Sequence, residues 1–124
     1  MKPMESFLML YYLLHQCQEI DPGDLSSGEL ILSDLLSGID PTLWADGRPM
    51  DQAIYRDWLE QTDISRLNRG NIISAVLSFV SLYENRGFHF GIVREILLGP
   101  ERETMIASAE RFTKCMYHKH NYPD

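Results

Sequence analysis

The sequence predicts an all-α protein, a single-domain bundle of about six helices. Two observations carry this prediction. Turn residues divide the chain into segments of helical length, and apolar residues recur within most segments at the three- to four-residue spacing of a helix. The chain has 124 residues and is 44% hydrophobic, which suits one domain that holds its core without disulfides or metal. We therefore expect residues 1–124 to form one helical domain.

The first two predicted helices span residues 4–18 and 27–37. The first carries apolar residues around its whole circumference, which is typical of a buried helix, and it ends at Asp21-Pro22-Gly23. Ser26 and Glu29 fit a capping box for the second, and Gly38 fits its end. The apolar stripe expected on the second helix comprises Leu25, Leu32, Leu35, Leu36 and Ile39.

A loop with Trp44 at its centre precedes the third predicted helix, residues 49–62, which has a proline in its first turn. Its residues Met50, Ile54 and Trp58 recur every four positions and therefore share a face.

The last three predicted helices span residues 70–86, 88–98 and 100–118. The helix at 70–86 has the strongest periodicity and is expected at the centre of the bundle; its apolar face comprises Ile72, Val76, Phe79, Val80 and Tyr83. The helix at 100–118 carries Met105, Ala109, Phe112 and Met116 on one side. No segment is predicted as a strand.

Charge is divided unequally between the two halves. Residues 1–63 hold twelve carboxylates and three basic side chains, a net charge of −9. Residues 64–124 hold six carboxylates and eight basic side chains, a net charge of +2. The two halves together give the total charge of −7. A field of one sign steers a basic partner toward the acidic half, although an acidic surface also serves solubility.

Several classes of protein are excluded or disfavoured. A net charge of −7 disfavours general nucleic-acid binding, which needs clustered lysine and arginine. The longest apolar run, Phe7 to Leu14, has eight residues against the ~20 of a membrane span. The same run lacks the flanks of a signal peptide, so we expect a cytoplasmic protein with Cys17 and Cys115 reduced.

Signatures of catalysis are missing from the sequence. It contains no nucleophile elbow and no glycine-rich phosphate loop. Cys115, His118 and His120 come nearest to a metal cluster, yet zinc needs three or four converging ligands and no second ligand pair is evident. We expect no enzyme activity, no cofactor and no metal; a metal-dependent enzyme using Cys115 and His118 is the minor alternative.

The first half of the chain resembles a known family. The run "FLMLYYLLHQCQEIDPGDLSSGELILSDLLSGI" followed by "DGRPMDQAIYRDWLEQ" resembles small bacterial immunity proteins of contact-dependent growth inhibition systems. The elements that match are an aromatic-rich helix, Ser33-Asp34-Leu35, the loop with Asp46-Gly47, and a helix with Asp51, Asp57-Trp58 and Glu60. The resemblance covers about residues 7–63; residues 64–124 match no family pattern.

This resemblance implies a cytoplasmic inhibitor that binds the C-terminal domain of a cognate toxin, often a nuclease, and blocks its active site or substrate groove. We also expect the chain to be a monomer before binding. The charge agrees, because a nuclease surface is basic. The family has no fixed contact residues, so the candidate contact surface follows from charge and exposure: Asp21, Asp24, Asp40, Trp44, Asp46, Asp57, Glu60 and Asp63.

Some assignments keep an alternative. Trp44 is an interface anchor or a lid folded back over the helices, and Asp34 and Asp51 are assigned to helix ends. The alternative function is a helical adaptor or self-associating protein that buries an apolar stripe, such as that of residues 100–118, against its own copy.

Overall fold

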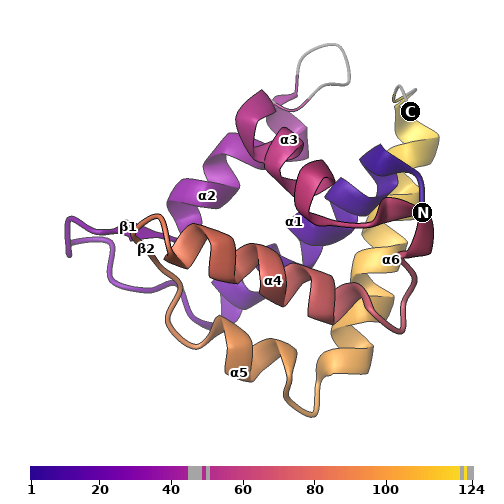
Figure 1. Cartoon of the computed structure of the whole chain (residues 1–124). Helices are drawn as coiled ribbons and strands as arrows, with labels where there is room; N and C mark the ends of the chain where they lie inside the picture. Colours follow the sequence, from indigo (N-terminus) through magenta and orange to yellow (C-terminus); the bar gives the residue numbers. More distant parts are fainter. Residues whose placement is uncertain (45–48, 50, 121, 123–124) are drawn as a thin grey trace.

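The computed structural model describes residues 1–44, 49, 51–120 and 122, and about two-thirds of these are helical. The predicted all-α bundle is confirmed (Figure 1). The α-helices are α1 (Pro3–Ile20), α2 (Leu32–Ile39), α3 (Gln52–Gln61), α4 (Ile72–Glu84), α5 (Val93–Leu97) and α6 (Arg102–Lys119). The shorter elements are the strands β1 (Leu30–Ile31) and β2 (Phe88–His89) and the 3₁₀ turns η1 (Pro41–Leu43) and η2 (Ile64–Arg66).

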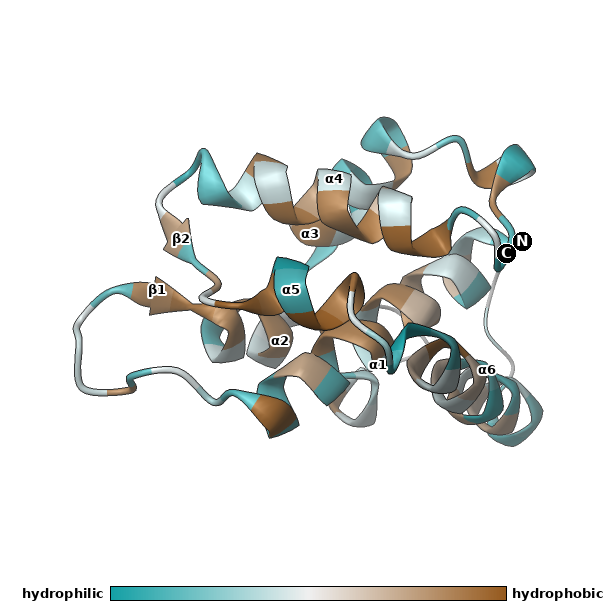
Figure 2. Ribbon diagram, turned by 90° about the horizontal axis from the view of Figure 1, so that it is seen from below, coloured by the Kyte–Doolittle hydropathy of each residue, from teal (hydrophilic) through white to brown (hydrophobic). Residues whose placement is uncertain are grey.

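α1, rather than the predicted α4, occupies the centre of the bundle. It contacts α2, α3, α5 and α6. Side chains on all its sides are buried, as its apolar circumference predicts. α4 buries only one face, the predicted one that contains Ile72, Val76, Phe79, Val80 and Tyr83. In Figure 2, apolar segments of α4 and α5 face the interior, whereas α6 is hydrophilic along its outer side.

Two acidic side chains hold helix ends, as predicted. Asp34 accepts a hydrogen bond of 2.8 Å from the backbone N–H of Ile31. Asp51 accepts from the backbone N–H groups of Ala53 and Ile54, at 3.0 and 3.1 Å. Each carboxylate satisfies N–H groups that have no partner within the helix, and it lies where the helix dipole favours negative charge.

The predicted helix at residues 27–37 is wrong at both ends. α2 begins at Leu32 and includes Gly38. The expected capping box is absent, because Ser27 Oγ accepts from the N–H of Glu29 and Gly28 has a φ of +76°. A left-handed residue at this position ends any regular helix. Residues 22–29 are consequently an exposed loop that precedes β1.

The predicted helix at residues 88–98 begins late, at Val93. Phe88 and His89 instead pair in parallel with Leu30 and Ile31, so the described residues contain a short two-stranded sheet where no strand was expected. The pairing joins segments 58 residues apart, which local periodicity does not reveal.

The remaining helices match their predictions with small differences. Ile54 and Trp58 are buried on α3, while Met50 lies outside the described residues. On α6, Met105 and Ala109 are buried as expected, but Phe112 is 53% exposed and Thr113 takes the buried position. Phe112 lies against the ring of Tyr12 at a centroid distance of 5.2 Å. The buried face of α6 is therefore shifted around the helix from the face that the sequence predicts.

Candidate protein-interaction surface

The end of α1 and the segment that follows it form a projecting acidic surface, residues 19–30, here called the acidic loop (Figure 1). It contains four carboxylates, those of Glu19, Asp21, Asp24 and Glu29. It also exposes three large aliphatic side chains: Ile20 at 58%, Leu25 at 75% and Leu30 at 48%. The structure thus brings Asp21 and Asp24, two of the predicted contact residues, next to apolar side chains.

Hydrogen bonds within the acidic loop define its shape. Asp24 Oδ1 accepts from the backbone N–H and the hydroxyl of Ser26, at 3.0 and 2.7 Å. These bonds hold the pKa of Asp24 below its usual value, with the hydroxyl as the larger cause. Asp21 Oδ1 accepts from the N–H of Gly23 at 3.3 Å. The carboxylate of Asp24 therefore remains charged at neutral pH.

The acidic loop is attached to the segment around β2. Leu30 pairs with Phe88 in the sheet, and Glu29 Oε2 lies 3.9 Å from His89 Nδ1. Gly91 has a φ of +59°, and a Cβ atom placed on it would lie 3.1 Å from Asp21 Oδ2. Its neighbour Ile92 is 48% exposed. The segment of Gly91 and Ile92 therefore lies beside Asp21, and we include Ile92 in the candidate surface with residues 19–30.

Basic side chains do not offset the charge of this surface. The sequence contains no lysine or arginine between Lys2 and Arg48. The ion-pair partners of the acidic loop are histidines: His15 Nε2 lies 2.9 Å from Glu19 Oε1, and His89 faces Glu29. Among the described residues, no lysine or arginine forms an ion pair with the acidic loop.

The predicted contact residues around α3 have a different environment. Asp57 Oδ2 accepts from Arg86 Nη1 and from the hydroxyl of Tyr83, both at 2.6 Å. The hydrogen bond from Arg86 is the largest cause of the lowered pKa of Asp57. Burial raises the pKa of Tyr83, and the bond to Asp57 adds to this shift. Asp57 thus joins α3 to α4 and the residues after it, rather than presenting a free carboxylate.

The other two acids of this region are exposed. Asp63 lies 3.5 Å from Arg66 Nε and accepts from the Ser65 hydroxyl at 2.7 Å, the main cause of its lowered pKa. Glu60 is on the exposed side of α3 and has no ion pair among the described residues. Asp63 is partly compensated, whereas Glu60 is free.

Asp40 and Trp44 lie at the opposite end of α2 from the acidic loop. Asp40 Oδ1 accepts from the N–H and the hydroxyl of Thr42, at 2.9 and 2.7 Å, and so caps η1. Trp44 is half-buried; its Nε1 donates to the carbonyl of Ile39 at 3.1 Å, and its ring stacks on Phe7 at 5.9 Å. Of the two roles considered for Trp44, this geometry corresponds to the lid folded back over the helices and not to the interface anchor. Asp46 lies outside the described residues.

The predicted contact residues that the structure describes therefore come from three segments and do not form one patch. α2 separates Asp24 from Asp40, and its 8 residues span about 12 Å. Of the three segments, only the acidic loop combines uncompensated charge with several exposed aliphatic side chains. The sequence analysis did not identify Leu25, Leu30 and Ile92 as part of a candidate surface. It assigned Leu25 to a helical stripe instead. The turn-rich run Asp21-Pro22-Gly23 to Gly28 was the signal that indicated a loop.

Groups with catalytic potential are dispersed. In the described part of the chain, no group of three or more His, Cys, Asp and Glu side chains is placed to hold a metal ion. Cys17 is fully buried, and burial raises the pKa of its thiol to about 12, whereas Cys115 is exposed. A thiol with so high a pKa is a poor nucleophile at neutral pH.

No described helix is both long enough and apolar enough to span a lipid bilayer. Comparison of the chain with protein-family models, with curated protein sequences and with solved structures finds no match.

Proposed function

We propose that this chain is a toxin-neutralising immunity protein, with the acidic loop as its contact surface. It binds a basic toxin domain, such as a nuclease, and blocks the active site or the substrate groove. The observation that supports this most directly is the acidic loop itself. Its four carboxylates have no lysine or arginine partner among the described residues, and it also carries three exposed aliphatic side chains. In this proposal the chain acts by occupying a surface and catalyses no reaction.

The charge of the acidic loop selects the class of partner. A nuclease carries a basic surface because it binds phosphates. Opposite potentials raise association rates toward about 10⁸–10⁹ M⁻¹s⁻¹ at low salt. Fast capture matters for an inhibitor that must meet the toxin in the cytoplasm, where we place both proteins, before the toxin acts.

Burial of the exposed aliphatic side chains would slow the dissociation of the complex. Single exposed apolar residues are ordinary on protein surfaces. Ile20, Leu25 and Leu30, however, belong to one acidic segment, and the segment that carries the exposed Ile92 lies beside it. An apolar centre with a polar rim is the usual anatomy of a protein interface, and apolar burial mainly slows dissociation.

Co-expression tests the proposal. The C-terminal domain of any large secreted protein encoded immediately upstream is expressed with and without this chain carrying an affinity tag. We expect growth arrest without the chain, growth with it, and recovery of an equimolar complex at low salt. No complex, together with a dimer of the chain that persists at high salt, would contradict the proposal and support the self-associating alternative.

A further inference from the structure

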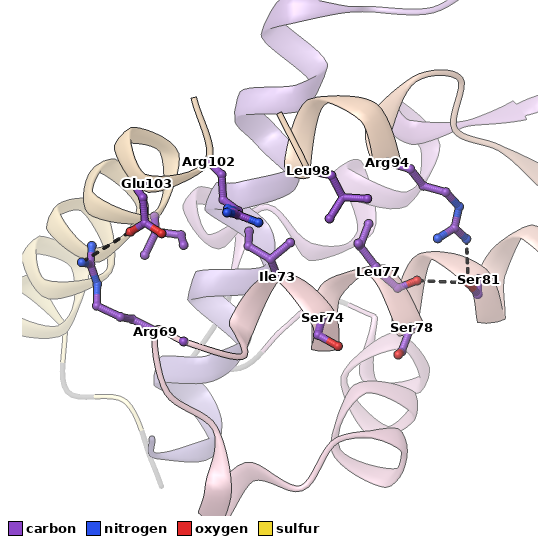
Figure 3. Close-up of a pocket in the computed structure, with 12 residues that line it drawn as sticks. Arg69, Ile73, Ser74, Leu77, Ser78, Ser81, Arg94, Leu98, Arg102 and Glu103 are labelled. Carbon is purple, nitrogen blue, oxygen red and sulfur yellow. Dashed lines mark hydrogen bonds and ion pairs between the residues drawn. The ribbon is translucent and has the colours of Figure 1, made fainter. Parts of the chain in front are cut away.

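A groove of about 510 Å³ lies between α4 and the segment formed by α5 and the start of α6 (Figure 3). This volume is within the range of small-molecule sites, roughly 300–1,000 Å³. The groove is formed by residues 69–106, outside the acidic loop and outside the segment that carries the family resemblance.

The groove has an apolar base. Ile73 and Ile106 are buried at 7% and 1% exposure, and Leu77 is half-buried beside Ile73 on α4. Leu98, 58% exposed, forms part of the wall opposite α4. A ligand that covered Leu98 and Leu77 would remove apolar surface from water, which favours binding of a molecule with an apolar group.

Two arginines at the ends of the groove are held in fixed positions by glutamates. Arg69 Nη2 lies 3.0 Å from Glu110 Oε1, and its Nη1 lies 3.7 Å from Glu103 Oε2. At the other end, Arg94 Nη2 donates to Ser81 Oγ at 2.6 Å and to Glu84 Oε1 at 2.5 Å. The glutamates offset the charge of these arginines, so neither supplies a free cation for a ligand.

Arg102 is the lining cation without such a partner. No ion pair or hydrogen bond engages its guanidinium within the described ranges of the chain. Figure 3 shows Arg102 extending from the start of α6 over Ile73. Ile73 and Leu77 extend from α4 toward Arg102 and Leu98, whereas the hydroxyls of Ser74 and Ser78 point to the other side of α4. Among the described residues, the middle of the groove thus has the unpaired guanidinium of Arg102 beside an apolar base.

We propose that this groove binds a small organic anion. Its phosphate or carboxylate group is held by Arg102, and its apolar group lies on Ile73, Leu77 and Leu98. Arginine suits this role because its planar donors match both anionic groups in a two-point contact. The proposal is independent of toxin binding by the acidic loop.

A titration with small probes tests the proposal. Phenyl phosphate and 3-phenylpropionate each combine an anionic group with an apolar ring, and inorganic phosphate lacks the ring. Backbone amide resonances of the ¹⁵N-labelled protein are followed at constant ionic strength. We expect saturable shifts around residues 73–81 and 102–106 with at least one organic anion, and at least tenfold weaker binding of inorganic phosphate. The organic anion that binds more tightly identifies the preferred anionic group.

A matched pair of variants makes the test specific. Arg102→Gln removes the free cation from the groove. Arg111→Gln removes an exposed arginine nine residues later, about two and a half turns along α6 and therefore on its opposite side. We expect Arg102→Gln to weaken binding at least tenfold and Arg111→Gln to leave it unchanged, with equal unfolding midpoints. No saturable shift with either organic anion, equal affinity of the two variants, or equally tight binding of inorganic phosphate would overturn the proposal.

Discussion

The indole Nε1 of Trp58 donates a hydrogen bond of 3.0 Å to the hydroxyl of Ser6, and both side chains are fully buried. The bond joins α3 to α1 across 52 residues of sequence. The same hydroxyl donates to the carbonyl of Pro3 at 2.6 Å. One serine therefore satisfies the only polar group of a buried tryptophan and fixes the position of α3 on the central helix.

Replacement of Ser6 by alanine is expected to destabilise the protein. Ser6→Ala leaves the indole N–H of Trp58 buried without an acceptor, at a cost of about 1–3 kcal/mol. The measurement is the free energy of unfolding in urea. Ser37→Ala is the control: Ser37 is exposed, and its hydroxyl donates only to the carbonyl of Asp34 in its own helix, so the expected change is below about 0.5 kcal/mol. Equal unfolding midpoints for the two variants would refute the role assigned to Ser6.

The contact between Asp57 and Arg86 predicts a pH-dependent contribution to stability. The pKa of Asp57 is lowered in the folded state, chiefly by the hydrogen bond from Arg86. Its contribution is therefore complete above the unfolded value of about 3.8 and is lost as pH falls through the lower folded pKa. We expect Asp57→Asn to be less stable than the natural protein at pH 7, with the difference narrowing below pH 4.

Urea unfolding at a series of pH values checks this prediction. Glu60→Gln, on the same helix, is the control because Glu60 has no ion pair among the described residues. The difference in unfolding free energy between Glu60→Gln and the natural protein should be the same at every pH. A difference between Asp57→Asn and the natural protein that stays constant down to pH 2 would show that charge on Asp57 does not stabilise the fold.

Two leucines that the sequence assigns to one helical stripe are expected to behave differently. Leu25 is 75% exposed in the acidic loop, whereas Leu35 is 1% exposed on α2. Leu35→Ala should cost about 2–5 kcal/mol because it leaves a cavity, and Leu25→Ala should change stability by less than about 0.5 kcal/mol. Thermal and urea unfolding measure both. A large loss of stability in Leu25→Ala would contradict the exposed loop and support the predicted helical stripe.

The long helices were predictable from periodicity because the positions of their apolar residues match the positions that are buried. The apolar circumference of α1 and the single apolar face of α4 correspond to their burial in the structure. The roles of Asp34 and Asp51 were also predictable, since a carboxylate at the start of a helix has backbone N–H groups within reach. These features depend on neighbours in sequence.

The features that sequence did not reveal depend on distant neighbours. Phe88 and His89 form a strand only because Leu30 and Ile31 lie beside them. Asp57 looked like a free surface acid, yet Tyr83 and Arg86 lie 26 and 29 residues away in sequence and bind it. The acidic character of the candidate surface was predictable from charge. Its apolar part was not, because Leu25 fits a helical stripe as well as an exposed turn.

The association rate of the co-expressed toxin domain with charge-reversed variants tests the central claim most directly. Asp24→Lys with Glu29→Lys reverses two charges of the acidic loop, and Glu101→Lys with Glu103→Lys reverses two exposed charges at the start of α6. Both pairs change the net charge from −7 to −3. If the acidic loop is the contact surface, the loop pair lowers the association rate constant at low salt by about tenfold or more, and the α6 pair by less than about threefold. Equal rates for the two pairs would contradict the account, because net charge alone, and not the acidic loop, would then govern binding.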